Sequence, residues 1–336
     1  MTKPYIITPS SEISADQLAE YLKNHEAEVQ TLLQKEGAIL FRGFKIETPK
    51  EFQTLAKVYS PNLAADYYGT SPRTKIEEAD EVFTASEIPA FFPMLQHCEM
   101  SFLKNNPNLI YFYCQQPPRK GGETPICDFR EVYRQMKPEI REKFETKKLK
   151  TIRQYHKVRK GLYNPFELKP WSEMFATTKR DEIEDICKKI DLQVEWGENE
   201  QLKLITYNEA FLKHPKTDDI IWHNHAQVFH ETSTVFECHR VLKRQRSLMS
   251  FATYLLSLIF LAARKFRKNA FVPMDVTFGD GTPIPGHYIK HVHDLIWKNQ
   301  IIFKWEKGDF LMLDNKRTSH GRLPYQGPRS ILVAWE

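Results

Sequence analysis

The sequence lacks the features that define several common protein classes. Its five cysteines form no Cys-x-x-Cys pair and are odd in number, which argues against a disulfide framework and against a closed zinc site. The N-terminal stretch MTKPYIITPSSEIS has no apolar core of a secretory signal. The longest apolar run, residues 251–263, is about 13 residues long, short of the ~20 that span a bilayer. We therefore expect a cytoplasmic protein with reduced thiols and no transmembrane segment.

Signatures of other chemistries are also missing. There is no P-loop, no G-x-S-x-G and no strand-borne G-x-G-x-x-G motif, and no repeat or low-complexity tract. With 48 Lys and Arg against 43 Asp and Glu, the net charge of +5 is small and requires no nucleic-acid partner. One basic cluster, residues 264–268, is a candidate contact for an acidic carrier protein, a nucleotide or a membrane, although a solvated surface is the simpler interpretation. The apolar run before it is compatible with a helix at a membrane surface, but we expect a buried or lid helix.

The composition supports a sizeable core. Of the 336 residues, 41% are hydrophobic and 12% aromatic, and we expect one domain over residues 1–336. Helical spacing from Ser14 to Leu33 and a proline-initiated helix at 49–58 flank a short buried strand at 38–41. Strand composition is clear at 107–114. The charged stretch that follows residue 129 is predicted to be helical.

A histidine and a carboxylate are separated by one residue in His97-Cys98-Glu99. On an extended backbone the two side chains project to the same side, and Cys98 points away as a buried apolar residue. In isolation, such a pair among twelve histidines and 43 acidic residues more often contains a surface histidine or one whose hydrogen bonds are satisfied structurally. Residues 305–314 predict a strand, a Gly-Asp turn and a second strand, which places His320 just after a strand end. Two histidines and one carboxylate form a facial triad, which suits iron(II) with open coordination positions.

The ordered motifs resemble the taurine dioxygenase and clavaminate synthase-like family of iron(II)/2-oxoglutarate dioxygenases, most closely its branch of natural-product amino-acid hydroxylases. The resemblance covers most of the chain. Its segments are GAILFRGF (37–44), SPRT (71–74), HCEMSF (97–102), GGETPICD (121–128), IWHNHAQVFH (221–230), FGDGTPIP (278–285) and KGDFLMLDNKRTSHGRLPYQGPRSILVAW (307–335).

The resemblance implies a mainly β fold with α elements: a double-stranded β-helix, or jelly roll, with flanking helices. It also implies helical insertion or lid regions at about 129–215 and 235–270, which would cover the mouth of the barrel. The implied metal ligands are His97, Glu99 and His320.

The co-substrate site has a physical argument of its own. Arg329 shares one face of an alternating strand with Ile331 and Val333, which places a guanidinium on the apolar side. Such a charge needs a carboxylate partner, either an internal Asp or Glu or the far carboxylate of a bound dicarboxylate. Thr124 offers a hydroxyl donor to the same group. The resemblance implies that Thr124 and Arg329 hold 2-oxoglutarate, with Arg322 as the reserve arginine.

The reaction implied by the resemblance uses iron(II), 2-oxoglutarate and O2, and releases succinate and CO2 while an unactivated C–H bond is oxidised. Halogenating relatives leave the carboxylate position empty, and Glu99 fills it here. Hydroxylation is therefore favoured over halogenation. Desaturation, epoxidation and ring closure by the same chemistry stay open, because substrate pose decides among them.

The substrate is less well specified. We expect an amino-acid-derived small molecule of secondary metabolism, either free or bound to a carrier protein. Candidate substrate contacts are Arg73, near the expected entrance, Tyr67, Asn224 and Gln227. His223 and His225, which flank Asn224, depart from the common family pattern and suggest altered substrate choice. A second metal cluster of His223, His225 and His230 is the less favoured interpretation.

A function of a different class is a binding or regulatory module without catalysis. A degenerate member of this kind is expected to have lost a metal ligand or the arginine. His97, Glu99, His320 and Arg329 are all present, so the sequence favours an enzyme.

Overall fold

The computed structural model describes residues 4–67, 69, 71, 73–158, 168–266 and 271–336. The helices are α1 (Ala15–Asn24), α2 (Glu26–Glu36), α3 (Pro49–Lys57), α4 (Phe129–Gln135), α5 (Pro138–Lys147), α6 (Trp171–Met174), α7 (Arg180–Lys189), α8 (Ala226–Phe229), α9 (Ser233–Gln245), α10 (Leu248–Phe266) and α11 (Gly286–Asn299), with a 3-10 turn at Glu198–Glu200. The strands are β1 (Tyr5–Ile7), β2 (Ala38–Phe41), β3 (Lys75–Ile76), β4 (Ala79–Thr84), β5 (Met94–His97), β6 (Leu109–Gln116), β7 (Lys120–Gly121), β8 (Ile126–Asp128), β9 (Leu149–Tyr155), β10 (Gln193–Trp196), β11 (Leu202–Asn208), β12 (Phe211–Lys213), β13 (Ile220–Trp222), β14 (Met274–Phe278), β15 (Phe310–Asp314), β16 (Thr318–Arg322), β17 (Tyr325–Gln326) and β18 (Ser330–Trp335).

A seven-stranded sheet in the order β1-β2-β15-β6-β18-β4-β3 forms the largest layer. Strand β6 pairs antiparallel with β15 on one side and β18 on the other. Its side chains alternate between two hydrophobic clusters: Ile110, Phe112 and Cys114 lie in one, and Tyr111 and Tyr113 in the other. The sheet is therefore buried on both faces.

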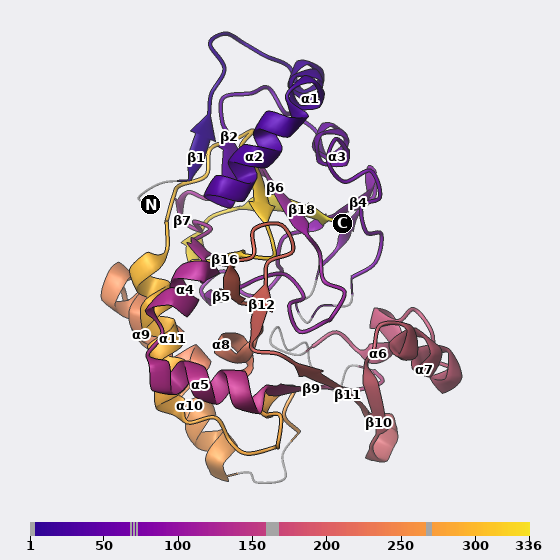
Figure 1. Ribbon diagram of the computed structural model, residues 1–336, viewed down its shortest axis with the longest axis vertical. Helices are drawn as coiled ribbons and strands as arrows, with labels where there is room; N and C mark the ends of the chain where they lie inside the picture. The colour runs from indigo at the N-terminus through magenta and orange to yellow at the C-terminus, as the bar shows by residue number, and fades with distance from the viewer. Residues whose placement is uncertain (1–3, 68, 70, 72, 159–167, 267–270) are drawn as a thin grey trace.

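The N-terminal helices cover one face of this sheet (Figure 1). Ser14 caps α1 as expected, in a capping box with Gln17. The single helix expected from Ser14 to Leu33 is wrong in one respect, because it is divided at His25 into α1 and α2. The proline-initiated helix is confirmed as α3, with Thr48 as its N-cap.

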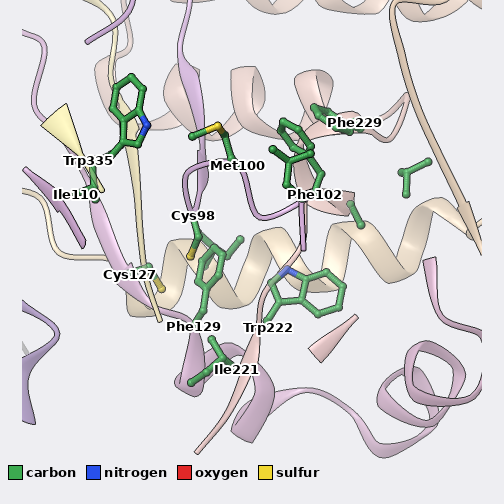
Figure 2. Packing of buried hydrophobic residues seen from close by; sticks show 14 of the residues in the cluster. Cys98, Met100, Phe102, Ile110, Cys127, Phe129, Ile221, Trp222, Phe229 and Trp335 are labelled. Atoms are coloured by element: carbon green, nitrogen blue, oxygen red, sulfur yellow. The ribbon is translucent and has the colours of Figure 1, made fainter. Parts of the chain in front are cut away.

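A three-stranded sheet in the order β5-β16-β8 brings distant segments together. His320 on β16 pairs in register with His97 on β5 and with Ile126 on β8. The larger hydrophobic cluster includes residues of this sheet and of the seven-stranded one. Figure 2 shows part of this cluster, where Phe102 lies beside Phe229 with ring centroids 5.7 Å apart.

Cysteines contribute to the core as thiols. All five are free and buried, so the absence of a disulfide framework is confirmed. Cys98 belongs to the larger cluster, and burial raises the pKa of its thiol. Cys98 therefore packs as a small buried residue between His97 and Glu99, the two expected metal ligands.

The stretch from 129 to 215 is less purely helical than its composition predicts. It contributes α4 to α7, but also β9 to β12. Strands β10, β11 and β9 join β14 in a four-stranded sheet, seen at the lower right of Figure 1. These strands are stabilised by pairing with segments that are distant in the sequence. A charged sequence with one apolar face does not by itself indicate such pairing. The strand expected at 305 is also absent; only β15 forms.

Helix α10 contains the longest apolar run. Of the expected buried or lid helix, the buried alternative is wrong for the outer face, where Phe251, Leu255 and Ile259 are exposed. Within the described residues, no helix is long and apolar enough to cross a membrane.

Candidate active site

The three expected metal ligands converge. His97 ends β5, and the antiparallel register sets His320 of β16 opposite it. The His97 ring donates from Nδ1 to the Leu95 carbonyl at 2.8 Å, which leaves the Nε2 lone pair available. Glu99 Oε2 lies 4.0 Å from His97 Nε2 and 3.6 Å from His320 Nε2. One ligand atom from each of the three residues lies within 4.8 Å of the others.

Burial and charge keep these groups in the states that bind a cation. Burial, with neighbouring His320, lowers the pKa of His97 to about 4, and burial also lowers the pKa of His320. Both imidazoles are therefore neutral at pH 7. Burial alone would raise the pKa of Glu99, but the Arg73 guanidinium and the two histidines hold it below its usual value. Two neutral imidazoles and one carboxylate are the ligand set of a 2-His-1-carboxylate site.

The His320 ring shows that a further group fits between these residues. Both of its ring nitrogens are buried, and neither has a hydrogen-bond partner within the described residues. Buried polar atoms are rarely left without partners unless a ligand or ion supplies one. A divalent metal ion bound to Nε2 would satisfy this atom.

Arg73 is placed differently from its expected position near the entrance. Its side chain is 1% exposed, and Nη2 donates to Glu99 Oε2 at 2.6 Å. The guanidinium lies over the Tyr67 ring, 4.5 Å from its centroid, and 5.3 Å from the Trp335 ring. This packing fixes the planar guanidinium against the carboxylate, so Arg73 orients Glu99 and keeps it ionised.

Asn315 positions Glu99 from the other side, and sequence reasoning missed this function. Its Oδ1 accepts from the Glu99 backbone N–H at 2.6 Å, while Nδ2 donates to the carbonyls of Glu99 and Pro107 at 3.1 and 2.9 Å. Met100, which follows Glu99 in the chain, has φ of +52°. This left-handed conformation costs energy for any residue other than glycine. The amide of Asn315 holds this strained turn in place.

We expect Asn315→Ala to lower the free energy of unfolding by about 2–4 kcal/mol, because buried backbone groups at Glu99 and Pro107 lose their partners. Urea unfolding measures the change. Exposed Asn105→Ala is the matched control and should shift stability by less than about 0.5 kcal/mol. Equal stability of the two variants would show that the turn does not depend on this amide.

Thr124 lies at the start of the segment that leads into β8 and is buried. Its Oγ1 accepts a hydrogen bond from Trp305 Nε1 at 3.0 Å. Because the indole N–H can only donate, the threonine hydroxyl hydrogen stays available to an anionic acceptor. Trp305 is a second residue whose function the sequence did not indicate.

Arg329 is half-buried and has no salt bridge to a carboxylate in the part of the chain that the structure describes. Its Nε donates to the Gly122 carbonyl at 3.1 Å, and its guanidinium lies 5.5 Å from the Tyr325 ring centroid. Burial, together with neighbouring Arg322, lowers its pKa to about 10, so it stays charged at pH 7. The alternative of an internal Asp or Glu partner is therefore not found among the described residues.

Gly122 permits the close approach of Arg329. Its φ is +70°, and a Cβ there would lie 2.6 Å from Pro118 Cγ and 3.3 Å from Arg329 Cδ. The preceding Gly121 also has positive φ, so the turn needs both glycines. The Gly-Gly pair thus shapes the wall against which the guanidinium lies.

Arg322 has other partners. Its terminal nitrogens donate to the carbonyls of Ile88, Pro89 and Phe92 at 3.0, 2.7 and 2.8 Å. These bonds tie the 88–92 loop to β16. The terminal nitrogens of Arg329 have no protein acceptor among the described residues, so Arg329 is better placed to bind a carboxylate than Arg322.

A pocket of about 350 Å³ of empty space opens beside the triad. Its lining residues are Tyr67, Ser71, Met94, Leu95, His97, Glu99, Phe102, His225 and Val228. The His225 ring lies 5.4 Å from that of His97, and Ser101 Oγ is 2.8 Å from His225 Nδ1. A larger hollow of about 880 Å³, beside His214 and Lys316, includes no triad residue among its lining. The residue types that line the smaller pocket, and not its volume, therefore identify it as the candidate active site.

Two expected substrate contacts have structural partners. Asn224 donates to the Ala210 carbonyl and accepts from the Ala226 N–H, and Gln227 accepts from Trp222 Nε1. Neither amide lines the pocket, and their function in substrate binding stays a prediction.

The other histidines near residue 225 do not form a second metal site in the described part of the chain. His223 Nε2 lies 3.1 Å from Asn106 Oδ1, and His230 contacts Thr232 Oγ1 and the Ile284 carbonyl. The only group of three or more potential ligands found among the described residues is the triad. These contacts support satisfied histidines rather than a metal cluster.

Comparison with known proteins agrees with this chemistry. The sequence matches the family described as "Taurine catabolism dioxygenase TauD, TfdA family" over residues 3–335. It is 29% identical to the dapdiamide synthesis protein DdaC of Enterobacter agglomerans, over 98% of this chain and 91% of that protein. It is 25% identical to a clavaminate synthase-like protein of Arabidopsis thaliana, over 98% and 92% of the two chains. The crystal structure of AAD-2 in complex with Mn(II) and N-oxalylglycine superposes with a TM-score of 0.53 at 12% identity, covering 100% and 94% of the two chains.

The fold and the His-Glu-His site define an iron(II)- and 2-oxoglutarate-dependent dioxygenase, which uses O2 as its oxidant. The chain belongs to the TauD/TfdA family.

Proposed function

We propose that this dioxygenase hydroxylates an unactivated aliphatic carbon of an amino-acid-derived small molecule. The observation that carries the proposal is the pocket that opens directly onto His97 and Glu99 and combines apolar with polar walls. An aliphatic carbon would face the metal along the apolar side, while the polar groups orient the rest of the molecule.

In this proposal His97, Glu99 and His320 would hold the iron, and a metal with three protein ligands would keep positions open for 2-oxoglutarate and O2. Bound iron with these co-substrates supplies oxidative decarboxylation to succinate and CO2, coupled to removal of a hydrogen atom from the substrate. Arg73 and Asn315 keep Glu99 ionised and oriented. The protein itself contributes ligand geometry and a buried, water-poor site.

Thr124 and Arg329 are proposed to bind the far carboxylate of 2-oxoglutarate. Trp305 fixes Thr124 so that its hydroxyl donates, and the terminal nitrogens of Arg329 supply a planar pair of donors. Residues on one face of β6 lie beside both groups. The Phe112 ring lies 4.9 Å from the His320 ring. Cys114 is two residues further along the same face; burial raises the pKa of its thiol, and the nearby Arg329 guanidinium lowers that pKa by a smaller amount.

The amino-acid-like character of the substrate rests on polar groups in the lining. Ser71, Tyr67 and His225 can bind amino or carboxylate groups, and Met94, Phe102 and Val228 can enclose a short side chain. The name of the DdaC relative, a dapdiamide synthesis protein, agrees with an amino-acid-derived natural product. Succinate formation with free amino acids and with carrier-protein thioesters distinguishes a free substrate from one loaded on a carrier protein.

Hydroxylation is proposed over halogenation because Glu99 fills the carboxylate position of the triad. We further propose that the seven-stranded sheet and the β5-β16-β8 sheet are the two halves of a double-stranded β-helix in one domain over residues 1–336. In this arrangement, regions 129–215 and 235–270 are insertions.

The test is succinate formation by iron(II)-loaded protein with 2-oxoglutarate and O2, against free amino acids and the same amino acids as carrier-protein thioesters. We expect one set to stimulate succinate release and to yield a product with one added oxygen atom. A product that has lost two hydrogen atoms would instead indicate desaturation or ring closure. Stimulation by taurine or aryloxy acids alone would overturn the proposed substrate class.

A further inference from the structure

Helix α10 is oriented with its polar side inward. Ser250, Thr253 and Ser257 are almost fully buried, at 2–4% exposure. Their hydroxyls are satisfied locally; for example, Thr253 donates to the Met249 carbonyl at 2.8 Å and Ser257 to the Tyr254 carbonyl at 2.6 Å. In water, the hydrophobic effect favours the opposite orientation. The outward apolar side therefore indicates a surface that is covered in use.

The outward side forms a continuous apolar stripe. Its exposed residues include Leu248, Met249, Phe251, Leu255, Leu258, Ile259 and Phe266. Most of them recur at intervals of three or four residues, so they line one side of a helix that is about 28 Å long. The two ends are the most exposed, with Leu248 and Phe266 both at 89%. Large connected apolar patches of this kind mark interaction sites.

Basic residues flank the stripe. Between Ser233 and Lys268 there are eight Lys or Arg and one Asp or Glu, a net charge of +7, whereas the rest of the chain has 40 basic and 42 acidic residues. Lys243, Arg244 and Arg246 are exposed just before α10. At its other end Arg264 pairs with Asp275 and Glu231, and the sequence continues with Lys265-Phe266-Arg267-Lys268, of which the last two lie outside the described residues. Among the described residues, the exposed positive charge beside the stripe is thus that of Lys243, Arg244 and Arg246, at its N-terminal end.

We propose that the outward side of α10 binds an anionic phospholipid bilayer, with the helix lying in the plane of the interface. Acyl chains adapt to a convex apolar stripe of any shape, and the exposed Lys243, Arg244 and Arg246 before its first residue meet lipid phosphates. The helix lies at the lower edge of the molecule in Figure 1, away from the N-terminal helices. Contact with a membrane surface requires no span, in agreement with the absence of a spanning helix among the described residues.

Charge argues against a second copy of this chain packed in parallel on this side. Such packing would place Lys243, Arg244 and Arg246 of one copy opposite the same cations of the other, which opposes association. An acidic protein would need an apolar groove that matches the whole stripe, whereas a fluid bilayer can cover the stripe without a preformed groove.

The experiment is co-sedimentation of the full chain with vesicles of phosphatidylcholine, with and without phosphatidylserine. We expect binding to the phosphatidylserine vesicles that weakens as salt is raised. The double variant Leu255→Gln/Ile259→Gln should bind at least about tenfold more weakly, because its acyl-chain contacts are lost. The matched control Val158→Gln/Tyr207→Gln changes exposed apolar residues elsewhere and should bind like the parent. Because the substituted side chains are exposed, both variants are expected to fold.

Several outcomes would overturn the proposal. These are absence of vesicle binding, equal binding by the α10 variant and its control, and equal binding to neutral vesicles at all salt concentrations. A dimer that the α10 variant abolishes, without lipid binding, would assign the stripe to a second copy. Capture of an acidic carrier protein without lipid binding would assign it to that class of partner.

Discussion

Replacing His97 with alanine is expected to abolish iron-dependent succinate formation while the protein stays folded. His97 supplies one of three ligand atoms that lie within 4.8 Å of one another, and no other described side chain forms such a group. Loss of a residue that only orients a metal ligand costs about 10–100-fold in metal affinity, and loss of a ligand itself should cost more. Metal titration and succinate release measure the two effects separately.

The control for His97→Ala is His25→Ala, which removes an exposed histidine between α1 and α2. This variant should bind metal and turn over 2-oxoglutarate like the parent. Thermal unfolding of both variants without metal shows whether the core is intact. Retention of iron affinity and turnover by folded His97→Ala would refute the assignment of the triad.

Substitution of Arg329 by glutamine is expected to raise the KM for 2-oxoglutarate by about 100-fold or more. The variant loses two charge-assisted hydrogen bonds to the carboxylate, each worth about 1.5–3 kcal/mol, and each 1.4 kcal/mol is a factor of ten in affinity. Metal affinity should change little, because Arg329 contacts Gly122 and Tyr325 rather than the triad. Initial rates at varied 2-oxoglutarate, with iron saturating, provide the measurement.

Variants of two further arginines test whether the rise in KM is specific to Arg329. Arg119→Gln removes an exposed guanidinium and should leave the KM unchanged. Arg322→Gln removes the donors to three loop carbonyls, so we expect reduced stability instead of a selective rise in KM. An unchanged KM for Arg329→Gln together with a large rise for Arg322→Gln would transfer the carboxylate-binding function to Arg322.

Local elements were predictable where their signals are local. The N-cap at Ser14, the proline at the start of α3 and the buried strand β2 all follow from residues within one element. The break at His25 and the strands β9 to β12 were not predicted. In both cases the alternative structure is decided by packing against other elements, which outweighs weak local propensity.

The residues of the site also divide into those with a local sequence signal and those without one. A residue type and a spacing identify His97 and Glu99, because a facial triad needs them on one side of the backbone. The Asn315 amide, in contrast, bonds to Glu99 across 216 residues, and Trp305 reaches Thr124 across 181. Asparagine and tryptophan have common structural uses elsewhere, so neither residue type indicates its partner.

The sequence by itself determined the family, the metal and co-substrate chemistry, and the five residues from His97 to Arg329 proposed to bind them, since these rest on residue identity and order. Only the tertiary structure decided that Arg73 is buried against Glu99, that Arg329 rather than Arg322 retains unoccupied donors among the described residues, and that α10 turns its apolar side outward. The physical reason is that periodicity defines the two sides of a strand or helix. Which side is covered, and by which distant partner, depends on the strand order β2-β15-β6-β18, which does not follow the chain.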